Sequence, residues 1–372
     1  MKAIKIVTYC YSYIKCFWQQ PLFKPRIRFS LLTKGGVKVT SYKLIIRQHT
    51  YISFHLFKVI SVSFDATMTF LTQIADTQIY QRIYPLIFLL VAFAVAVVPF
   101  TLHVMLHPFT YILSTAPLSV RLRTARSKFF YYSWRVLSPL LDPVDEPMKR
   151  PLLAKGRGVV LEIGAGVGDN IKYYDRRQVE RLILVEPNAD MHPLLRAKAN
   201  ASGYKEMDAS LLLLGCGGAA SDELALEKAG IGAGSVDTIM VIHVLCSIPG
   251  PAEAVELYRR LLKPGGQLVF CEHVKNEERT TAQWQTWYTK KIWRTAFDGC
   301  ELDRPTGEWI VNGPNTATNG IATSRGGAMI NGAHLEAGGA LKKRWREYEI
   351  KAPDDQNKYS LIPHVVGWAT KA

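Results

Sequence analysis

The chain has 372 residues, 48 % of them hydrophobic, which suits one large core and is too apolar for global disorder. Residues 1–67 supply +10 of its net charge of +15, so the rest of the chain carries only about +5. A basic surface over the main domain is therefore not expected, and the charge distribution argues against nucleic acid as a partner.

The cysteines give no sign of a disulfide framework or a metal site. None of them forms a C-x-x-C pair or an alternating Cys/His ligand set. We therefore expect reduced cysteines in a cytosol-facing domain, and no metal. The six positions are Cys10, Cys16, Cys216, Cys246, Cys271 and Cys300.

The first segment, residues 1–67, mixes basic, aromatic and aliphatic residues without a helical or strand period. It lacks the charged start, apolar run and small-residue cleavage site of a secretory signal. We interpret it as a disordered basic extension, or as sequence upstream of a natural start at Met68. The alternative is an organelle-targeting segment, since it is basic and poor in acids.

A membrane segment is predicted at residues 83–120, where thirty-eight consecutive residues include no Asp, Glu, Lys or Arg. About 20 apolar residues suffice to cross a bilayer as a helix. Pro99 would kink such a helix, so two geometries are open: a single span, or a re-entrant hairpin that turns near Pro99 and Pro108.

Basic residues follow this segment and suggest its orientation. Arg121, Arg123, Arg126, Lys128 and Arg135 lie on its C-terminal side, which the positive-inside rule places in the cytosol. The aromatic-basic run at residues 129–135 suits a lipid–water interface, and equally suits the first helix of a globular domain.

A glycine-rich turn follows a buried-strand pattern at residues 159–163. Gly164, Gly166 and Gly168 give the spacing GxGxG, and glycines there let the chain turn tightly and a ligand approach the backbone. The spacing differs from the GxGxxG of dinucleotide binders. Glu162 precedes the turn, where it would orient the loop or receive an amino group of the ligand.

A second strand, residues 181–185, ends in Glu186, twenty-two residues after Gly164. An acid in this register can accept hydrogen bonds from both hydroxyls of a ribose. Further on, residues 235–243 predict another parallel strand and residues 254–262 a helix. Lys263-Pro264-Gly265-Gly266 would stop that helix before a strand at residues 267–273.

Taken together, these motifs resemble the class I, Rossmann-like methyltransferases that use S-adenosylmethionine. The resemblance implies an α/β fold: a seven-stranded, mostly parallel sheet with helices on both faces, preceded by an N-terminal membrane-associating helix or hairpin. Residues 345–350 and 364–369 would be the last two strands, one of them antiparallel. The catalytic domain would occupy residues 121–372.

The same resemblance implies the cofactor site. The glycine turn would contact the methionine part and Glu186 the ribose. The adenine contact usually comes from the loop after the third strand, which we place in the unusual run of residues 211–218. The expected cofactor-binding residues are Glu162, Gly164, Ala165, Gly166, Gly168, Glu186, Pro187, Asn188, Asp208, Cys216, Gly217 and His243.

A narrower similarity is to the methyltransferase-like thiol S-methyltransferases. It rests on residues 244–248, 272–274, 297–304 and 363–369, and it implies a membrane-anchored enzyme on endoplasmic reticulum or lipid droplets that methylates a small acceptor such as an alkyl thiol. The similarity breaks at residues 311–340, which are rich in Gly, Ala, Asn and Thr and which we interpret as a flexible insertion.

Candidate catalytic residues are His273 and His243, which follow two strands at the ligand-binding edge, and Asp298. Each has an ordinary alternative: a hydrogen-bonded structural histidine, or an Asp that caps a turn. Trp284, Trp287, Trp293 and Phe297 would cover the acceptor or serve as core residues. Competing functions are a lipid or quinone methyltransferase, a non-catalytic membrane adaptor and, against the glycine spacing, an NAD(P)-dependent oxidoreductase.

Overall fold

The computed structural model describes residues 78–313, 333–335 and 341–372. The chain divides into two units, Met1–Tyr80 and Gln81–Ala372, and the second contains the sheet. The extension predicted at residues 1–67 and most of the insertion predicted at residues 311–340 lie outside the described residues.

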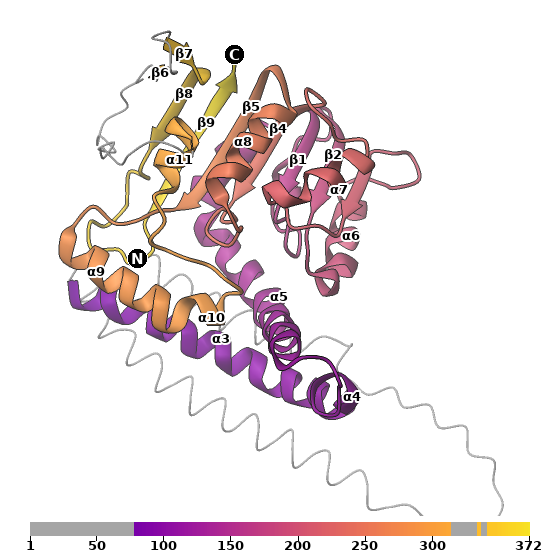
Figure 1. Cartoon of the computed structure of the whole chain (residues 1–372), viewed down its shortest axis with the longest axis vertical. Helices are drawn as coiled ribbons and strands as arrows, with labels where there is room; N and C mark the ends of the chain where they lie inside the picture. The colour runs from indigo at the N-terminus through magenta and orange to yellow at the C-terminus, as the bar shows by residue number, and fades with distance from the viewer. Residues whose placement is uncertain (1–77, 314–332, 336–340) are drawn as a thin grey trace, which may run out of the picture. The chain divides into compact units, whose positions relative to one another are not determined.

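A seven-stranded sheet forms the centre of the second unit, with strand order β3-β2-β1-β4-β5-β9-β8 (Figure 1). The first five strands in this order are parallel, whereas β9 runs antiparallel to both β5 and β8. The predicted fold class and its antiparallel last strand are therefore confirmed. The strands are β1 (Gly158–Ile163), β2 (Val179–Val185), β3 (Leu211–Leu214), β4 (Val236–Ile242), β5 (Leu262–His273), β8 (Trp345–Lys351) and β9 (His364–Lys371); β6 (Ala333–Leu335) and β7 (Leu341–Lys343) form a separate hairpin.

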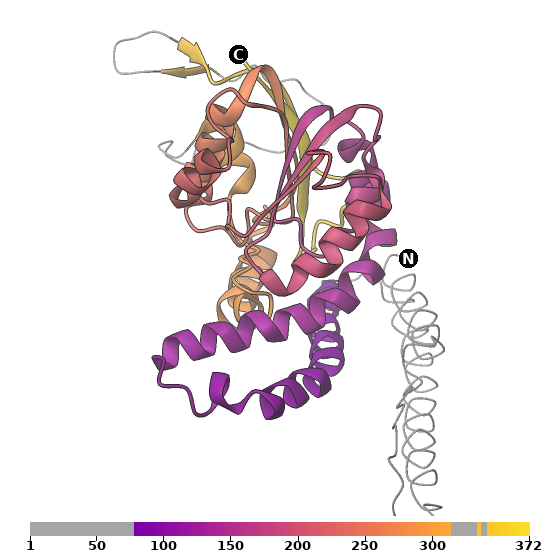
Figure 2. The same ribbon diagram turned by 90° about the vertical axis from the view of Figure 1, so that its right-hand side faces the viewer.

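Helices cover both faces of the sheet, because its central strands are apolar on both sides (Figure 2). One face packs on the C-terminal part of α5 (Leu118–Leu153) and on α6 (His192–Ala201). The other face packs on α7 (Glu223–Lys228), α8 (Pro251–Leu261) and α11 (Thr306–Asn312). Short 3-10 turns lie at Ile171–Tyr173, Ala189–Met191 and Ala220–Asp222.

Two strand boundaries differ from the sequence-based expectation. Residues 211–214 are the third strand itself, so the loop that follows it starts only at Gly215. The four-leucine run pairs with β2 and fills the sheet edge, because aliphatic residues in this position can be half-buried. The Lys263–Gly266 turn does end α8, but β5 already begins at Leu262, with a register shift against β4.

The apolar segment forms a helical hairpin with the start of α5 (Figures 1 and 2). Helix α3 (Gln78–Leu106) continues through Pro85 and Pro99, and the chain then turns back through α4 (Pro108–Tyr111) into α5. The returning helix touches α3 directly, since Ser133 Oγ donates to Ala92 O at 3.2 Å and the Phe100 and Phe129 rings lie 5.5 Å apart. Within the described residues, α3 is the one helix long and apolar enough to cross a membrane.

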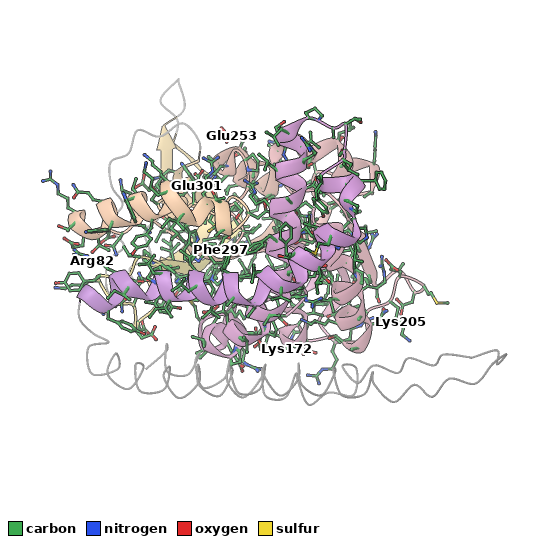
Figure 3. All side chains as sticks on the ribbon, turned by 90° about the horizontal axis from the view of Figure 1, so that it is seen from below. Arg82, Lys172, Lys205, Glu253, Phe297 and Glu301 are labelled. Carbon is green, nitrogen blue, oxygen red and sulfur yellow. The ribbon has the colours of Figure 1, made fainter. Side chains whose placement is uncertain are left out.

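A second group of short helices lies beside α3. It comprises α9 (Arg279–Tyr288), a π-helical turn (Thr289–Trp293) and α10 (Arg294–Ala296). Phe88 of α3 stacks on Trp293 and Phe297, with ring centroids 5.9 and 5.3 Å away. Figure 3, which labels Phe297, shows it beside the middle of α3. The apolar helix thus shares a small core with the domain that contains the sheet.

Candidate active site

The glycine turn after β1 has a backbone that only glycine adopts without strain. Gly164, Gly166 and Gly168 have φ angles of +67°, +56° and +83°. Gly164 N donates to Val185 O at 2.8 Å, which pulls the turn against the end of β2. A β-carbon on Gly164 would overlap Val244 Cγ2, so the first glycine is also needed for space. The turn therefore presents bare backbone at the carboxyl edge of the sheet, where ligands of such sheets bind.

Glu186 joins this turn to the end of β2. Its side chain is buried, and its two oxygens accept hydrogen bonds from Gly166 N and Asn188 N, both at 2.8 Å. Burial raises the pKa of the carboxyl group, and the two backbone donors oppose that shift. The structure thus places the acid against the glycine turn, at the register that the sequence predicted.

Glu162 has a different environment. It is 1 % exposed, and its oxygens accept from Asn170 Nδ2 at 2.8 Å and Tyr174 Oη at 2.9 Å. Burial raises its pKa as well, against these two hydrogen bonds. Because both oxygens already hold the segment after the turn, Glu162 orients the loop, one of the two roles considered for it.

Helix α5 covers the turn, and Trp134 of the aromatic-basic run packs on the domain there. A β-carbon added to Gly166 would lie 3.2 Å from Trp134 Nε1. Ser138 Oγ donates to Asp169 Oδ2 at 2.7 Å, and Asn188 Nδ2 donates to Ser127 Oγ at 3.1 Å. Trp134 and Ser138 were missed in the sequence, because nothing local indicates which helix face meets the turn.

The three candidates for the adenine contact separate in space. Asp208 precedes β3 and accepts from Ser210 N at 3.0 Å, so it lies toward the amino edge, away from the glycine turn. Cys216 and Gly217 follow β3 at the carboxyl edge. Beside them, the His192 ring bonds Glu186 O at 2.8 Å and lies 3.5 Å from a β-carbon added to Gly215. Only Cys216 and Gly217 are therefore retained.

Three histidines gather at the ends of β4, β5 and β9. The rings of His243 and His273 stack with centroids 5.0 Å apart and planes inclined by 4°. His364, which the sequence analysis treated only as part of a strand, lies 4.9 Å from His243 and 4.8 Å from His273. Burial, and then the two neighbouring histidines, hold the pKa of His243 well below its usual value, so its imidazole is neutral near pH 7.

Two cysteines lie next to these histidines. Cys246 Sγ and Cys300 Sγ are 3.2 Å apart, and Cys300 Sγ lies 3.6 Å from His273 Nδ1. Asp298, predicted as a catalytic candidate, pairs with Arg126 of α5 at 3.0 Å and has a left-handed φ of +42°. This ion pair links α5 to the segment that carries Cys300, so Asp298 is placed to position that segment.

Comparisons with known proteins bear on the geometry above. The family described as "Methyltransferase domain" matches residues 140–305, which include the glycine turn, Glu186 and the cysteine pair. A human thiol S-methyltransferase, TMT1B, is 28 % identical over 193 residues, covering 50 % of this chain and 74 % of the relative. The human thiol S-methyltransferase TMT1A is 28 % identical over 149 residues, covering 40 % of this chain and 56 % of the relative. The chain is a SAM-dependent methyltransferase. A solved O-methyltransferase family protein from Burkholderia thailandensis is 14 % identical, covers 74 % of this chain and 71 % of its own length, and superposes with a TM-score of 0.42.

In this methyltransferase the four predicted cover aromatics divide into two groups. Trp293 and Phe297 are 3 % and 6 % exposed and lie in the small core beside Cys246 and Cys300. Trp284 and Trp287 are 39 % and 46 % exposed on α9. Only the first pair therefore borders the histidines and cysteines, together with Phe88 of α3, which precedes the matched residues.

Proposed function

We propose that this methyltransferase takes a methyl group from S-adenosylmethionine and gives it to the thiol of a small apolar acceptor at a membrane surface. The observation that carries the proposal is the buried Glu186 carboxylate, bonded to the backbone of the glycine turn at Gly166. This places an acceptor for ribose hydroxyls beside a backbone cradle, as the class I resemblance requires.

The residues present fit that donor. S-adenosylmethionine supplies an electrophilic sulfonium methyl group when bound. The glycine turn would hold its amino acid end, since side chains at Gly164 and Gly166 would fill the space against Val244 and Trp134. Glu186 would hold the ribose by exchanging its backbone donors for hydroxyl donors, with Pro187 and Asn188 shaping that loop. Cys216 and Gly217 would flank the adenine from the loop after β3.

A thiol acceptor is supported by the chemistry around the cysteine pair and by the relatives, which are named thiol S-methyltransferases. The surroundings are apolar, because Phe88, Trp293 and Phe297 pack together there. A thiol reacts as its thiolate, so it needs a proton acceptor. We assign that role to His243, whose imidazole is neutral and which directly precedes Val244, the residue beside Gly164.

The α3–α5 hairpin would contact the membrane by lying in one leaflet. The face of α3 away from the domain exposes Leu90 at 70 % and Phe93 at 58 %, and the turn exposes Phe109 at 77 %. The start of α3 is tied to α9, since Tyr288 Oη donates to Arg82 O at 2.7 Å. Both ends of the helix thus belong to the domain, and a hairpin of this kind suits the cytosolic face of endoplasmic reticulum or the monolayer of a lipid droplet.

A lipid or quinone acceptor is the second candidate, because the same exposed apolar surface would deliver either class of molecule from the bilayer. Incubation with S-adenosylmethionine and either an alkyl thiol or a ubiquinol analogue separates the two. Mass detection of a thioether supports the first proposal, and detection of an aryl ether supports the second.

The donor site is tested by calorimetric titration of the full chain in detergent with S-adenosylmethionine and, separately, with NADH. We expect Glu186→Ala to weaken donor binding about 10- to 100-fold, as for lost hydrogen bonds to a charged group. Glu180→Ala is the matched control, because Glu180 is exposed on the same strand and should leave binding unchanged. Absence of donor binding by folded protein would favour the adaptor function, and NADH binding would favour the oxidoreductase.

A further inference from the structure

Five side chains that carry metal-binding atoms converge beyond the ends of β4, β5 and β9. The ligand atoms of Cys246, His273 and Cys300 all lie within 4.8 Å of one another, and so do those of His243, His273 and His364. His243 and Cys246 lie in the same loop after β4, whereas His273, Cys300 and His364 come from three other segments of the sequence. The two groups share His273.

We propose that Cys246, His273 and Cys300 bind one zinc-class divalent cation and leave its fourth position open. This site lies outside the donor-binding turn and Glu186. It also departs from the absence of metal that the cysteine spacing led us to expect.

The spacing of the three ligand atoms fits tetrahedral coordination. Bonds of about 2.3 Å to sulfur and about 2.0 Å to nitrogen put neighbouring tetrahedral ligands roughly 3.4–3.8 Å apart. The Sγ–Sγ separation of 3.2 Å and the Sγ–Nδ1 separation of 3.6 Å lie close to that range. The third separation, from Cys246 Sγ to a His273 ring nitrogen, is within 4.8 Å, so small movements of the side chains would bring all three atoms around one ion.

The chemistry of the set favours a soft cation. Two thiolates neutralise a divalent charge, and two cysteines with one histidine are a ligand set of catalytic zinc sites that keep the fourth position for water or substrate. Cys246 and Cys300 are 1 % and 6 % exposed, so their sulfur atoms have little contact with bulk water. Three histidines offer no compensating charge, which is why we place the ion on the cysteine side of His273.

The surroundings supply the outer contacts that such a site needs. Trp293 Nε1 lies 3.3 Å from Cys300 Sγ and can donate to the thiolate. Arg304 Nη1 donates to the carbonyls of Leu245 and Ile248, at 2.6 and 2.7 Å, and fixes the loop around Cys246. Glu301 N donates to Cys246 O at 2.9 Å, which ties the two cysteine segments together. The ligands are thus held before any ion binds.

The open fourth position would take up the acceptor thiol of the proposed function, and this step of the inference rests on that function. An acceptor thiol would replace the water on the ion: its S–H bond breaks, a sulfur–metal bond forms, and the proton passes to solvent. The result is a thiolate held near neutral pH beside the glycine-turn neighbour Val244. The proposed ion is thus the group that would ionise and orient the thiol acceptor of the proposed function.

The test uses the full chain, purified reduced, stripped with a chelator and titrated with Co²⁺ and then Zn²⁺. We expect one ion per chain, a sulfur-to-cobalt charge-transfer band in the near ultraviolet, and displacement of cobalt by zinc. Cys246→Ser and Cys300→Ser should each lose that intensity and bind at least about 100-fold more weakly. Cys216→Ser, a cysteine outside the cluster, should keep the metal content of the parent.

Three results would overturn the proposal. The first is no tight metal binding by reduced, folded parent chain. The second is retention of metal by Cys300→Ser together with its loss in His364→Asn, which would move the ion to the three histidines. The third result would contradict only the open fourth position: the cobalt spectrum does not change when an alkyl thiol is added.

Two controls separate the loss of metal binding from misfolding and from loss of donor binding. In the parent chain, bound Zn²⁺ should protect Cys246 and Cys300, but not Cys216, from alkylation as mapped by mass spectrometry, so a variant that fails to fold does not remove the test. Titration of the cysteine variants with S-adenosylmethionine reports on the Glu186 site. Loss of metal with intact donor binding separates a failed metal site from a failed donor site.

Discussion

Along the carboxyl edge of the sheet, the β1–β2 half is built from backbone, whereas the β4–β5–β9 half is built from side chains. In the first half, glycines with positive φ and the acid Glu186 form one continuous hydrogen-bonded turn. In the second, histidines and cysteines from distant segments meet beside Phe88 of α3 and the aromatic residues Trp293 and Phe297 that flank α10. The first half uses backbone groups that any member of the fold class can offer to a shared ligand. The side chains of the second half can differ between proteins, to suit different acceptors, without disturbing the first half.

The two halves also differ in what covers them. The C-terminal part of α5 closes the glycine-turn half through polar contacts, such as Ser138 to Asp169. The apolar helix α3 closes the histidine–cysteine half through Phe88. Under the proposed function, the donor would enter from water and the acceptor from the membrane side. Three pairs of substitutions can break or sharpen this contrast.

The largest effect is expected at the glycine turn. Gly164→Ala should lower the free energy of unfolding by about 4 kcal/mol, because it adds both left-handed strain and overlap with Val244. Gly230→Ala is the matched control, since Gly230 has a φ of +82° but no neighbour within 4 Å of an added β-carbon. Its cost should be about 1 kcal/mol. Urea unfolding followed by circular dichroism measures both, and equal losses would show that backbone conformation alone shapes the turn.

The next effect concerns the ion pair that fixes α5 behind the turn. Asp142 is 2 % exposed, pairs with Lys149 and Lys172, and accepts from Tyr173 Oη at 2.8 Å. Asp142→Asn should cost about 3 kcal/mol at pH 7, because Lys149 stays buried without its partner charge. Glu146→Gln, one turn further along and more exposed, should change stability little.

The pH dependence of that loss gives a second check. Burial would raise the pKa of Asp142, but hydrogen bonds from Lys149 and Lys172 outweigh it and hold the pKa below its usual range. Stability from a depressed carboxyl pKa is present above the unfolded value of about 4 and is lost as pH falls through the folded value. The difference between parent and Asp142→Asn should therefore shrink below about pH 4. A constant difference would assign the loss to packing.

The smallest effect separates the two faces of α3. Leu89 packs into the core beside Cys246 and Cys300, whereas its neighbour Leu90 is 70 % exposed. Leu89→Ala should destabilise the protein by about 2 kcal/mol, and Leu90→Ala by less than about 0.5 kcal/mol. Flotation with phosphatidylcholine vesicles should show the reverse order, with Leu90→Ala binding about tenfold more weakly. Vesicle binding that ignores Leu90 would contradict membrane contact through this face.

The sequence alone determined the fold class and the glycine-turn half of the edge. The glycine turn, Glu186 and the last two strands are each encoded by short contiguous runs, in which strand period, glycine spacing and register follow from local backbone requirements. The exception, residues 211–214, shows the limit of this reasoning, since a short apolar run fixes neither where its strand begins nor which loop follows it.

Only the tertiary structure decided the rest. It turned the apolar segment into a hairpin whose inner face packs on Trp293, set Trp134 over Gly166, moved Asp208 to the far edge and paired Asp298 with Arg126. Above all, it brought His364 and Cys300 to His273 and Cys246. Such convergence depends on strand order and helix packing over more than a hundred residues, and sequence spacing does not reveal it.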